Sequence, residues 1–173
     1  NMKFPANLSL YSIGNGIGSV SLERETAEYV TSTAVYAQAI RVEQPMRISS
    51  VSLAMKKFGG DGMVYLDLVQ DDNGKPSLAG VRSHLLSLEN IRRSPGYGWV
   101  EFFFPIDTPQ LPGGKYWIVL RRSGEAIMNW YFTPGKPYGG ADDTRSTSRG
   151  WQWEDILTYD FVFKVKGKLA HNN

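Results

Sequence analysis

The sequence predicts an all-β fold, an antiparallel β-sandwich or barrel of about eight strands. In several segments apolar and polar residues alternate with a period of two, which is typical of strands with one buried face. Turn-forming residues separate these segments at short intervals, and no segment has a convincing amphipathic helical pattern. We expect one domain, because 173 residues with 42% hydrophobic and 13% aromatic content can form one substantial core.

Two segments, 47–57 and 63–70, show the alternation most clearly. Each is predicted to be a half-buried strand, because successive side chains of a strand point to opposite faces. The buried faces are expected to hold Val51, Leu53 and Met55 in the first strand and Val64, Leu66 and Leu68 in the second. In the second strand Tyr65, Asp67 and Val69 are expected to point the opposite way. Asp71-Asp72-Asn73-Gly74 then supplies turn chemistry.

Further strands are expected at 36–42, 81–88, 99–104, 115–121, 126–132 and 160–166. The segments between them are rich in Gly and Pro, which reverse the backbone or remove a ladder hydrogen bond. We divide the chain into residues 1–35, residues 36–168 as the β-sandwich domain, and 169–173 as a flexible tail. Residues 8–13 could form a strand and 23–29 a turn, so the first part is either an edge of the sandwich or an arm that docks on a neighbouring domain or subunit.

Three segments together resemble a jelly-roll module: AQAIRV (37–42), ISSVSLAMKK (48–57) and LPGGKYWIVL (111–120). Such modules occur in bacterial surface proteins and phage tail proteins, and they are similar in layout to carbohydrate-binding modules and choice-of-anchor type domains. The resemblance covers about residues 36–167. It implies a jelly-roll β-sandwich with a non-catalytic role in attachment or in spacing other domains. It carries over no ligand residue, so it supports the fold more than the function.

An aromatic-rich loop after Phe132 is the candidate ligand site. Aromatic faces can stack on the C–H face of a sugar ring, and carboxylates and guanidinium groups can bond neighbouring hydroxyls. The predicted ligand-binding residues are Tyr138, Trp151 and Trp153 for stacking and Asp142, Asp143 and Arg145 for hydroxyls. Two alternatives stay open: the tryptophans could instead anchor the loop on the sheet, and the polar residues could simply be solvated. Trp130 is expected in the core.

Several classes of function are disfavoured by composition. The chain has no cysteine, and neither His84 nor His171 lies in a hydrolase or metalloprotease motif, so we expect no enzyme activity. A net charge of +2 with mixed signs does not predict nucleic-acid binding. No apolar run is long enough to insert into a membrane. No cofactor is expected, although Asp71-Asp72 and Asp142-Asp143 admit a structural calcium ion.

The sequence therefore predicts a carbohydrate-binding or adhesion module at a cell surface, in the extracellular space or on a virion. Its partners would be a polysaccharide or glycan, with neighbouring domains or sister subunits. The alternative is a structural module of a virion tail or surface assembly that uses the same face for subunit packing.

Overall fold

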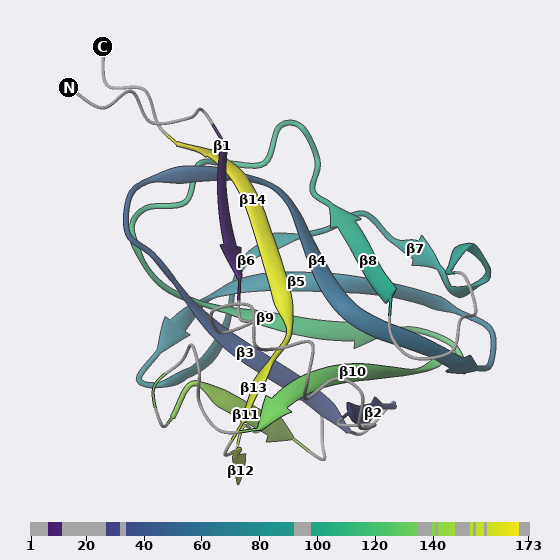
Figure 1. Cartoon of the computed structure of the whole chain (residues 1–173). Coiled ribbons are helices and arrows are strands. Elements are labelled where there is room, and N and C mark those ends of the chain that lie inside the picture. Colours follow the sequence, from purple (N-terminus) through teal and green to yellow (C-terminus); the bar gives the residue numbers. More distant parts are fainter. Residues whose placement is uncertain are drawn as a thin grey trace.

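The computed structural model describes residues 7–11, 27–31, 34–91, 98–134, 140, 142–147, 153, 155–157 and 159–169. In these residues the chain forms two seven-stranded sheets that lie face to face (Figure 1). Every strand pairing is antiparallel. The helical structure of the described residues is one 3-10 turn, Leu88–Asn90. The predicted all-β sandwich of antiparallel sheets is confirmed.

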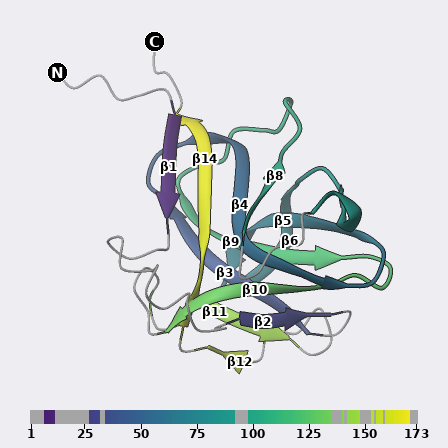
Figure 2. The ribbon, with the colours of Figure 1, turned by 45° about the vertical axis from the view of Figure 1, so that its right-hand side comes forward.

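The first sheet has the long strand β4 at its centre. One side of β4 pairs with β14 and then β10, and the other side pairs with β8. β1 extends the sheet beyond β14, and β2 and β13 pair with β10. Figure 2 shows β1 and β14 side by side. The strands are β1 (Asn7–Tyr11), β2 (Ala27–Val30), β4 (Met46–Gly59), β8 (Gly98–Phe103), β10 (Ile127–Pro134), β13 (Tyr159–Phe161) and β14 (Phe163–Leu169).

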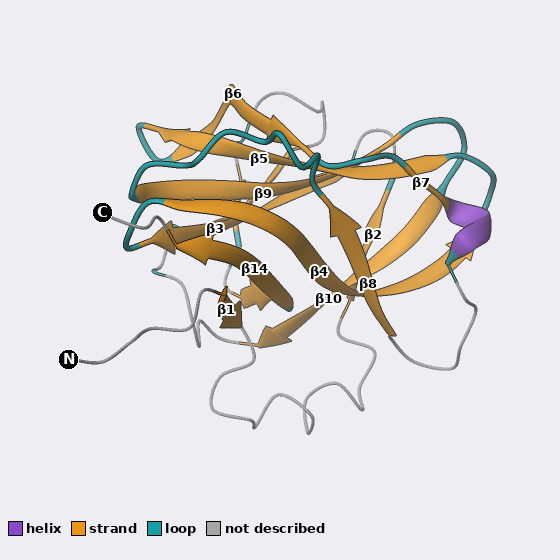
Figure 3. Ribbon diagram, turned by 90° about the horizontal axis from the view of Figure 1, so that it is seen from above, coloured by secondary structure: helices purple, strands orange, loops and turns teal. Residues whose placement is uncertain are grey.

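The second sheet runs in the order β12-β11-β3-β9-β5-β6, and β7 pairs with β5. Viewed from above, it forms a layer over the first sheet (Figure 3). Its strands are β3 (Val35–Val42), β5 (Met63–Asp72), β6 (Lys75–Arg82), β7 (Leu86–Ser87), β9 (Gly114–Arg122), β11 (Thr144–Thr147) and β12 (Asp155–Ile156).

The core lies between the sheets and follows the alternation in the sequence. Val51, Leu53 and Met55 on β4 face Val64, Leu66 and Leu68 on β5, and all six belong to one buried cluster. Burying such a side chain contributes about 1.5–3 kcal/mol relative to leaving it exposed. Trp130 joins this cluster fully buried, as predicted, and stacks on Phe161 with ring centroids 4.1 Å apart.

The two sheets contain more strands than the eight or so that the sequence predicts. The expected strand at 81–88 is wrong in its bounds, because β6 begins at Lys75 and ends at Arg82. Pro76 and Gly80 in this segment are typical of turns, but an edge strand tolerates both. β5 and β6 are joined by a hairpin with the two-residue loop Asn73-Gly74, as the turn residues at 71–74 predict. Both loop residues have positive φ, 51° at Asn73 and 85° at Gly74.

Eight strands, four from each sheet, account for the main pairing order. In the first sheet the order is β2-β10-β4-β8, and in the second it is β3-β9-β5-β6. Successive strands from β2 to β5 alternate between the two sheets. Of the other strands, β14 pairs with the central strand β4 and is followed by β1, and the rest are short strands that pair with β10, β3, β11 or β5.

Both strands of the N-terminal segment pair with the first sheet. β2 lies beside β10, and Glu28 of β2 accepts a hydrogen bond from the Tyr36 hydroxyl of β3 at 2.7 Å. β2 overlaps the segment 23–29, where the sequence predicts a turn. A strand of four residues is too short to show the period-two alternation by which a strand is predicted. Among the described residues, no helix has the length and apolar character needed to cross a membrane.

Candidate functional site

The structure describes four of the six residues predicted to bind a ligand. Asp142 is exposed, Arg145 is half-buried, and Asp143 and Trp153 are buried. Tyr138 and Trp151 lie outside the described residues. The four described residues lie in or near β11, which extends the second sheet beyond β3.

Asp143 forms a charge-compensated contact that fixes the start of β11. Its Oδ1 accepts a hydrogen bond from Lys115 Nζ at 2.7 Å, its Oδ2 accepts one from the Gly140 N–H at 2.9 Å, and Arg41 lies 3.7 Å away. Burial alone would raise the pKa of Asp143, but the hydrogen bonds and the two cations outweigh burial and lower it. Both carboxylate oxygens therefore have partners within the protein.

Trp153 packs against the outer face of the second sheet. Only 5% of its surface is exposed, and it belongs to a cluster formed by Val35, Ala37, Ala39, Val69, Trp117 and Val119. Its carbonyl oxygen accepts a hydrogen bond from Arg145 Nη1 at 3.2 Å. The sequence leaves open whether this tryptophan stacks on a sugar or anchors the loop on the sheet. The buried position of Trp153 is that of an anchor. Small residues on β3 make room for its ring.

A buried polar network joins β3, β11 and β13 beneath this anchor. The Gln38 side chain donates to Asp160 Oδ1 at 3.2 Å and accepts from the Thr144 hydroxyl at 2.9 Å and from the Phe161 N–H at 2.8 Å. All three polar side chains are fully buried. Because a buried polar group without a partner is costly, this network fixes the register of the short strands.

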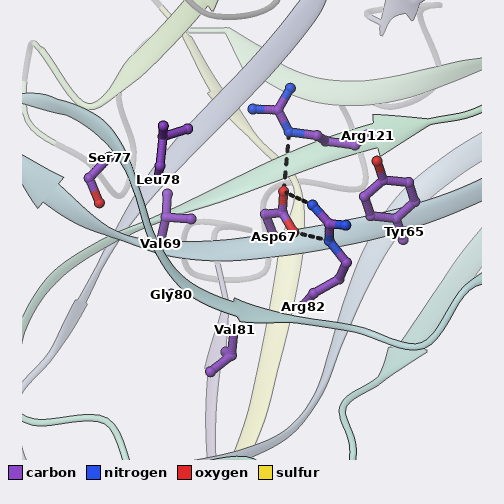
Figure 4. Close-up of a pocket in the computed structure, with 9 residues that line it drawn as sticks. All are labelled: Tyr65, Asp67, Val69, Ser77, Leu78, Gly80, Val81, Arg82 and Arg121. Atoms are coloured by element: carbon purple, nitrogen blue, oxygen red, sulfur yellow. Dashed lines mark hydrogen bonds and ion pairs between the residues drawn. The ribbon is translucent and has the colours of Figure 1, made fainter.

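Next to the Trp153 cluster, the same face of the second sheet forms an open groove of about 560 Å³. It lies over β5, β6 and β9, and Val69 belongs both to its lining and to the Trp153 cluster. Figure 4 shows the groove, with two arginines directed at one carboxylate. Its lining includes Tyr65, Asp67, Val69, Leu78, Arg82 and Arg121.

Strand alternation and register place these side chains together. Because Val64, Leu66 and Leu68 point into the core, Tyr65, Asp67 and Val69 point outward, as predicted. Across the ladders, Tyr65 lies opposite Arg121 and Asp67 lies opposite Arg82. Gly80 lets β6 approach β5 closely, since a Cβ there would collide with the Leu68 carbonyl oxygen.

The polar centre of the groove is the Asp67 carboxylate with its two arginines. Arg82 donates from Nε to Oδ1 at 2.7 Å and from Nη2 to Oδ2 at 3.2 Å, a two-point contact. Arg121 Nε donates to Oδ2 at 3.2 Å. The Arg82 guanidinium also lies 4.6 Å from the centroid of the Tyr65 ring. The arginines have further N–H groups that point away from this carboxylate.

The sequence provides only part of the signal for this groove. The outward position of Tyr65 and Asp67 follows from the period of β5, but Arg82 and Arg121 lie on other strands. Their approach depends on which strands pair, and a sequence pattern does not supply that pairing. The sequence indicates the groove only through Tyr65 and Asp67, an aromatic and an acidic residue on the outer face of the same strand.

Comparison with known proteins identifies similar folds but no family. No family model matches the sequence, and no curated protein matches it. The chain is similar to a structure of the clostridial cysteine protease Cwp84 after propeptide cleavage, with 16% identity and a TM-score of 0.58, over 95% of this chain and 41% of that one.

A second similar structure contains the cysteine protease and lectin-like domains of Cwp84, a surface layer associated protein of Clostridium difficile. Its identity is 17% and its TM-score 0.55, over 82% of this chain and 34% of that one. The chain thus spans less than half the length of either structure. At these identities the likeness concerns the fold alone.

Proposed function

We propose that this domain is a non-catalytic carbohydrate-binding module that holds a glycan in the groove over β5, β6 and β9. The observation that carries the proposal is the placement of the Asp67 carboxylate, two arginines and the Tyr65 ring in one open groove. Carboxylate and guanidinium groups offer paired acceptors and donors at the spacing of neighbouring sugar hydroxyls. The apolar walls, Val69 and Leu78, suit the C–H face of a sugar ring.

The groove is also preorganised for binding. Asp67 is mostly buried and held by both arginines, so its carboxylate loses little freedom when a ligand arrives. β5 and β9 are central strands of the sheet, and sites on such strands are held more precisely than sites on loops.

The fold supports the same proposal. The orders β2-β10-β4-β8 and β3-β9-β5-β6 support a jelly-roll topology, in which eight strands form two four-stranded sheets. We infer that the part of Cwp84 similar to this chain is its lectin-like domain, which supports a binding role and a cell-surface or extracellular location.

The loop after Phe132 keeps a place in this proposal. Trp153 and Asp143 are both buried, and through Val69 the Trp153 cluster adjoins the groove. Tyr138, Trp151 and Asp142 are proposed to add ligand contacts from the loop, on the grounds of residue type.

A glycan array followed by titration calorimetry tests the proposal. We expect millimolar or tighter binding of at least one neutral glycan by the wild type, lost in Tyr65→Ala and in Arg82→Ala. Glu43→Ala, an exposed change in the turn between β3 and β4, is the control and should bind normally. Thermal melts establish that each variant is folded.

Absence of binding to every neutral glycan at millimolar concentration would overturn the proposal. The alternative, a structural module of a virion or surface assembly, predicts self-association instead. Light scattering would then show an oligomer that Tyr65→Ala disrupts, whereas a monomer that binds glycan supports the carbohydrate-binding role.

A further inference from the structure

The outer face of the first sheet, on the opposite side of the sandwich from the groove, is strongly basic. Lys164, Lys166 and Lys168 alternate along β14 and point outward, because Phe163 and Val165 between them are buried. Alternate residues of a strand are about 7 Å apart. The register places Lys168 opposite Arg47 of β4. β14 therefore presents a row of three lysines, and Arg47 lies beside the last of them on β4.

Acidic residues are scarce on this face. The outward sides of β4, β8 and β14 carry one acidic residue, Glu101, and five cations: Arg47, Lys56, Lys164, Lys166 and Lys168. Glu101 lies 3.7 Å from Lys166 Nζ and accepts a hydrogen bond from the Ser50 hydroxyl at 2.5 Å. One carboxylate does not neutralise this surface, whose charge favours an anionic partner.

Exposed aromatic rings accompany the cations on the neighbouring strand β8. Trp99 is 36% exposed and Phe103 is 57% exposed, and both flank Glu101 on the outward side of the strand. Lys164 Nζ lies 4.0 Å from the centroid of a Trp99 ring, so the lysines of β14 and the aromatic residues of β8 belong to one continuous surface. The two aromatic residues are four positions apart, about 14 Å along the strand.

Two hollows mark the ends of this surface. Trp99 and Glu101 line one of about 390 Å³. Arg47 and Lys168 line another of about 200 Å³ together with Ile106, which is almost fully exposed. A ligand that follows the face from Trp99 to Arg47 would pass Lys164 and Lys166 between the hollows.

We propose that this face binds an acidic polysaccharide, a chain of sugar rings that carries carboxylate or sulfate groups. The lysines and Arg47 pair with the anionic groups, and Trp99 and Phe103 contact the C–H faces of the rings. Glu101 decides between a polysaccharide and a nucleic acid. The Glu101 carboxylate can accept hydrogen bonds from sugar hydroxyls, which a polysaccharide carries on its rings and a DNA strand lacks.

This site is distinct from the groove in position and ligand. The groove is on the outer face of the second sheet, and no described residue that lines it also lines either hollow of the first sheet. The proposal for the first sheet therefore does not depend on neutral glycan binding by the groove.

Binding of the full chain to polygalacturonate, heparin and a neutral galactan, measured by calorimetry at low and high salt, tests the proposal. We expect polygalacturonate or heparin to bind, and to bind more weakly as salt rises, because the lysine contacts are screened. The two polymers distinguish carboxylate from sulfate recognition. Lys166→Gln should weaken binding about fivefold and Lys166→Gln/Lys168→Gln more strongly.

Matched controls separate this site from the groove and from nonspecific charge. Lys75→Gln removes an exposed cation from the other sheet and should leave binding unchanged. Tyr65→Ala and Arg82→Ala should also leave it unchanged, and Trp99→Ala should weaken it even at high salt. The proposal is overturned if neither acidic polymer binds, if Lys75→Gln matches Lys166→Gln, or if a DNA strand of equal charge binds more tightly than both polymers.

Discussion

At the scale of single residues, Asp143, one of the predicted ligand residues, has stabilising contacts within the fold. Its carboxylate is buried and bonded to Lys115 and to the Gly140 N–H. Asp143→Asn removes the charge but not the size of the side chain. We expect it to lower the free energy of unfolding by about 2 kcal/mol, because Lys115 loses a charged hydrogen-bond partner.

The pH dependence of this loss has a definite sign. The folded state lowers the pKa of Asp143 below 3.8, so its contribution is fully present above that value and disappears as the pH falls through the lower pKa. Denaturant melts of the wild type and Asp143→Asn should therefore differ at pH 6 and converge in strong acid. A difference that does not change with pH would contradict this account.

Among the predicted ligand residues that the structure describes, Trp153 buries the largest side chain. Trp153→Ala should lower the free energy of unfolding by roughly 3–5 kcal/mol, because a buried indole leaves a cavity above Ala37 and Ala39. Trp99→Ala is the matched control, since Trp99 is 36% exposed and its loss should cost much less. Chemical denaturation measures both. Equal losses would show that Trp153 does not anchor the loop.

At the scale of elements, β2 is held by one carboxylate between two tyrosines. Burial raises the pKa of both Tyr36 and Tyr159 well above the usual range, and the Glu28 carboxylate raises them further. The protonated tyrosines therefore stabilise the fold below about pH 10, where unfolded tyrosine titrates, and that stability is lost as the pH rises through the higher folded-state pKa.

Glu28→Gln tests this contact. The amide can still accept a hydrogen bond, but it lacks the negative charge, so we expect the two tyrosines to ionise at lower pH than in the wild type. Ultraviolet absorbance of tyrosinate against pH measures the shift, with Glu43→Gln as the control. Hydrogen exchange of the β2 amides should also become faster. Superimposable titration curves for the wild type and Glu28→Gln would contradict the contact.

The elements also show how far the sequence predicts the fold and the site. Alternation correctly identifies the buried faces of β4 and β5, and the outward position of Tyr65 and Asp67 follows from it. The sequence does not predict the start of β6 at Lys75, because Pro76 and Gly80 are typical of turns and are tolerated in a strand mainly at the edge of a sheet. The groove needs Arg82 and Arg121 from two other strands, and their approach to Asp67 depends on long-range pairing that no local pattern contains.

At the scale of the whole molecule, the last strand closes the sandwich, although it is far from its partner in sequence. β14 pairs with β4 from Phe163↔Leu53 to Leu169↔Met46, and β13 pairs with β10. Phe161, Phe163 and Val165 lie fully buried in the common core. The two sheets should therefore unfold as one cooperative unit.

Truncation after Leu157 tests this cooperativity, because it removes β13 and β14 together. We expect the shortened chain to lose its cooperative thermal transition entirely, since the core would lose Phe161, Phe163 and Val165 and β4 would be left with an unpaired edge. Truncation after Leu169 is the control and should keep the wild-type transition, because β14 ends there. Calorimetry measures both transitions. A sharp transition in the chain that ends at Leu157 would mean that β3 to β10 form a stable unit, with β13 and β14 added as a separate layer.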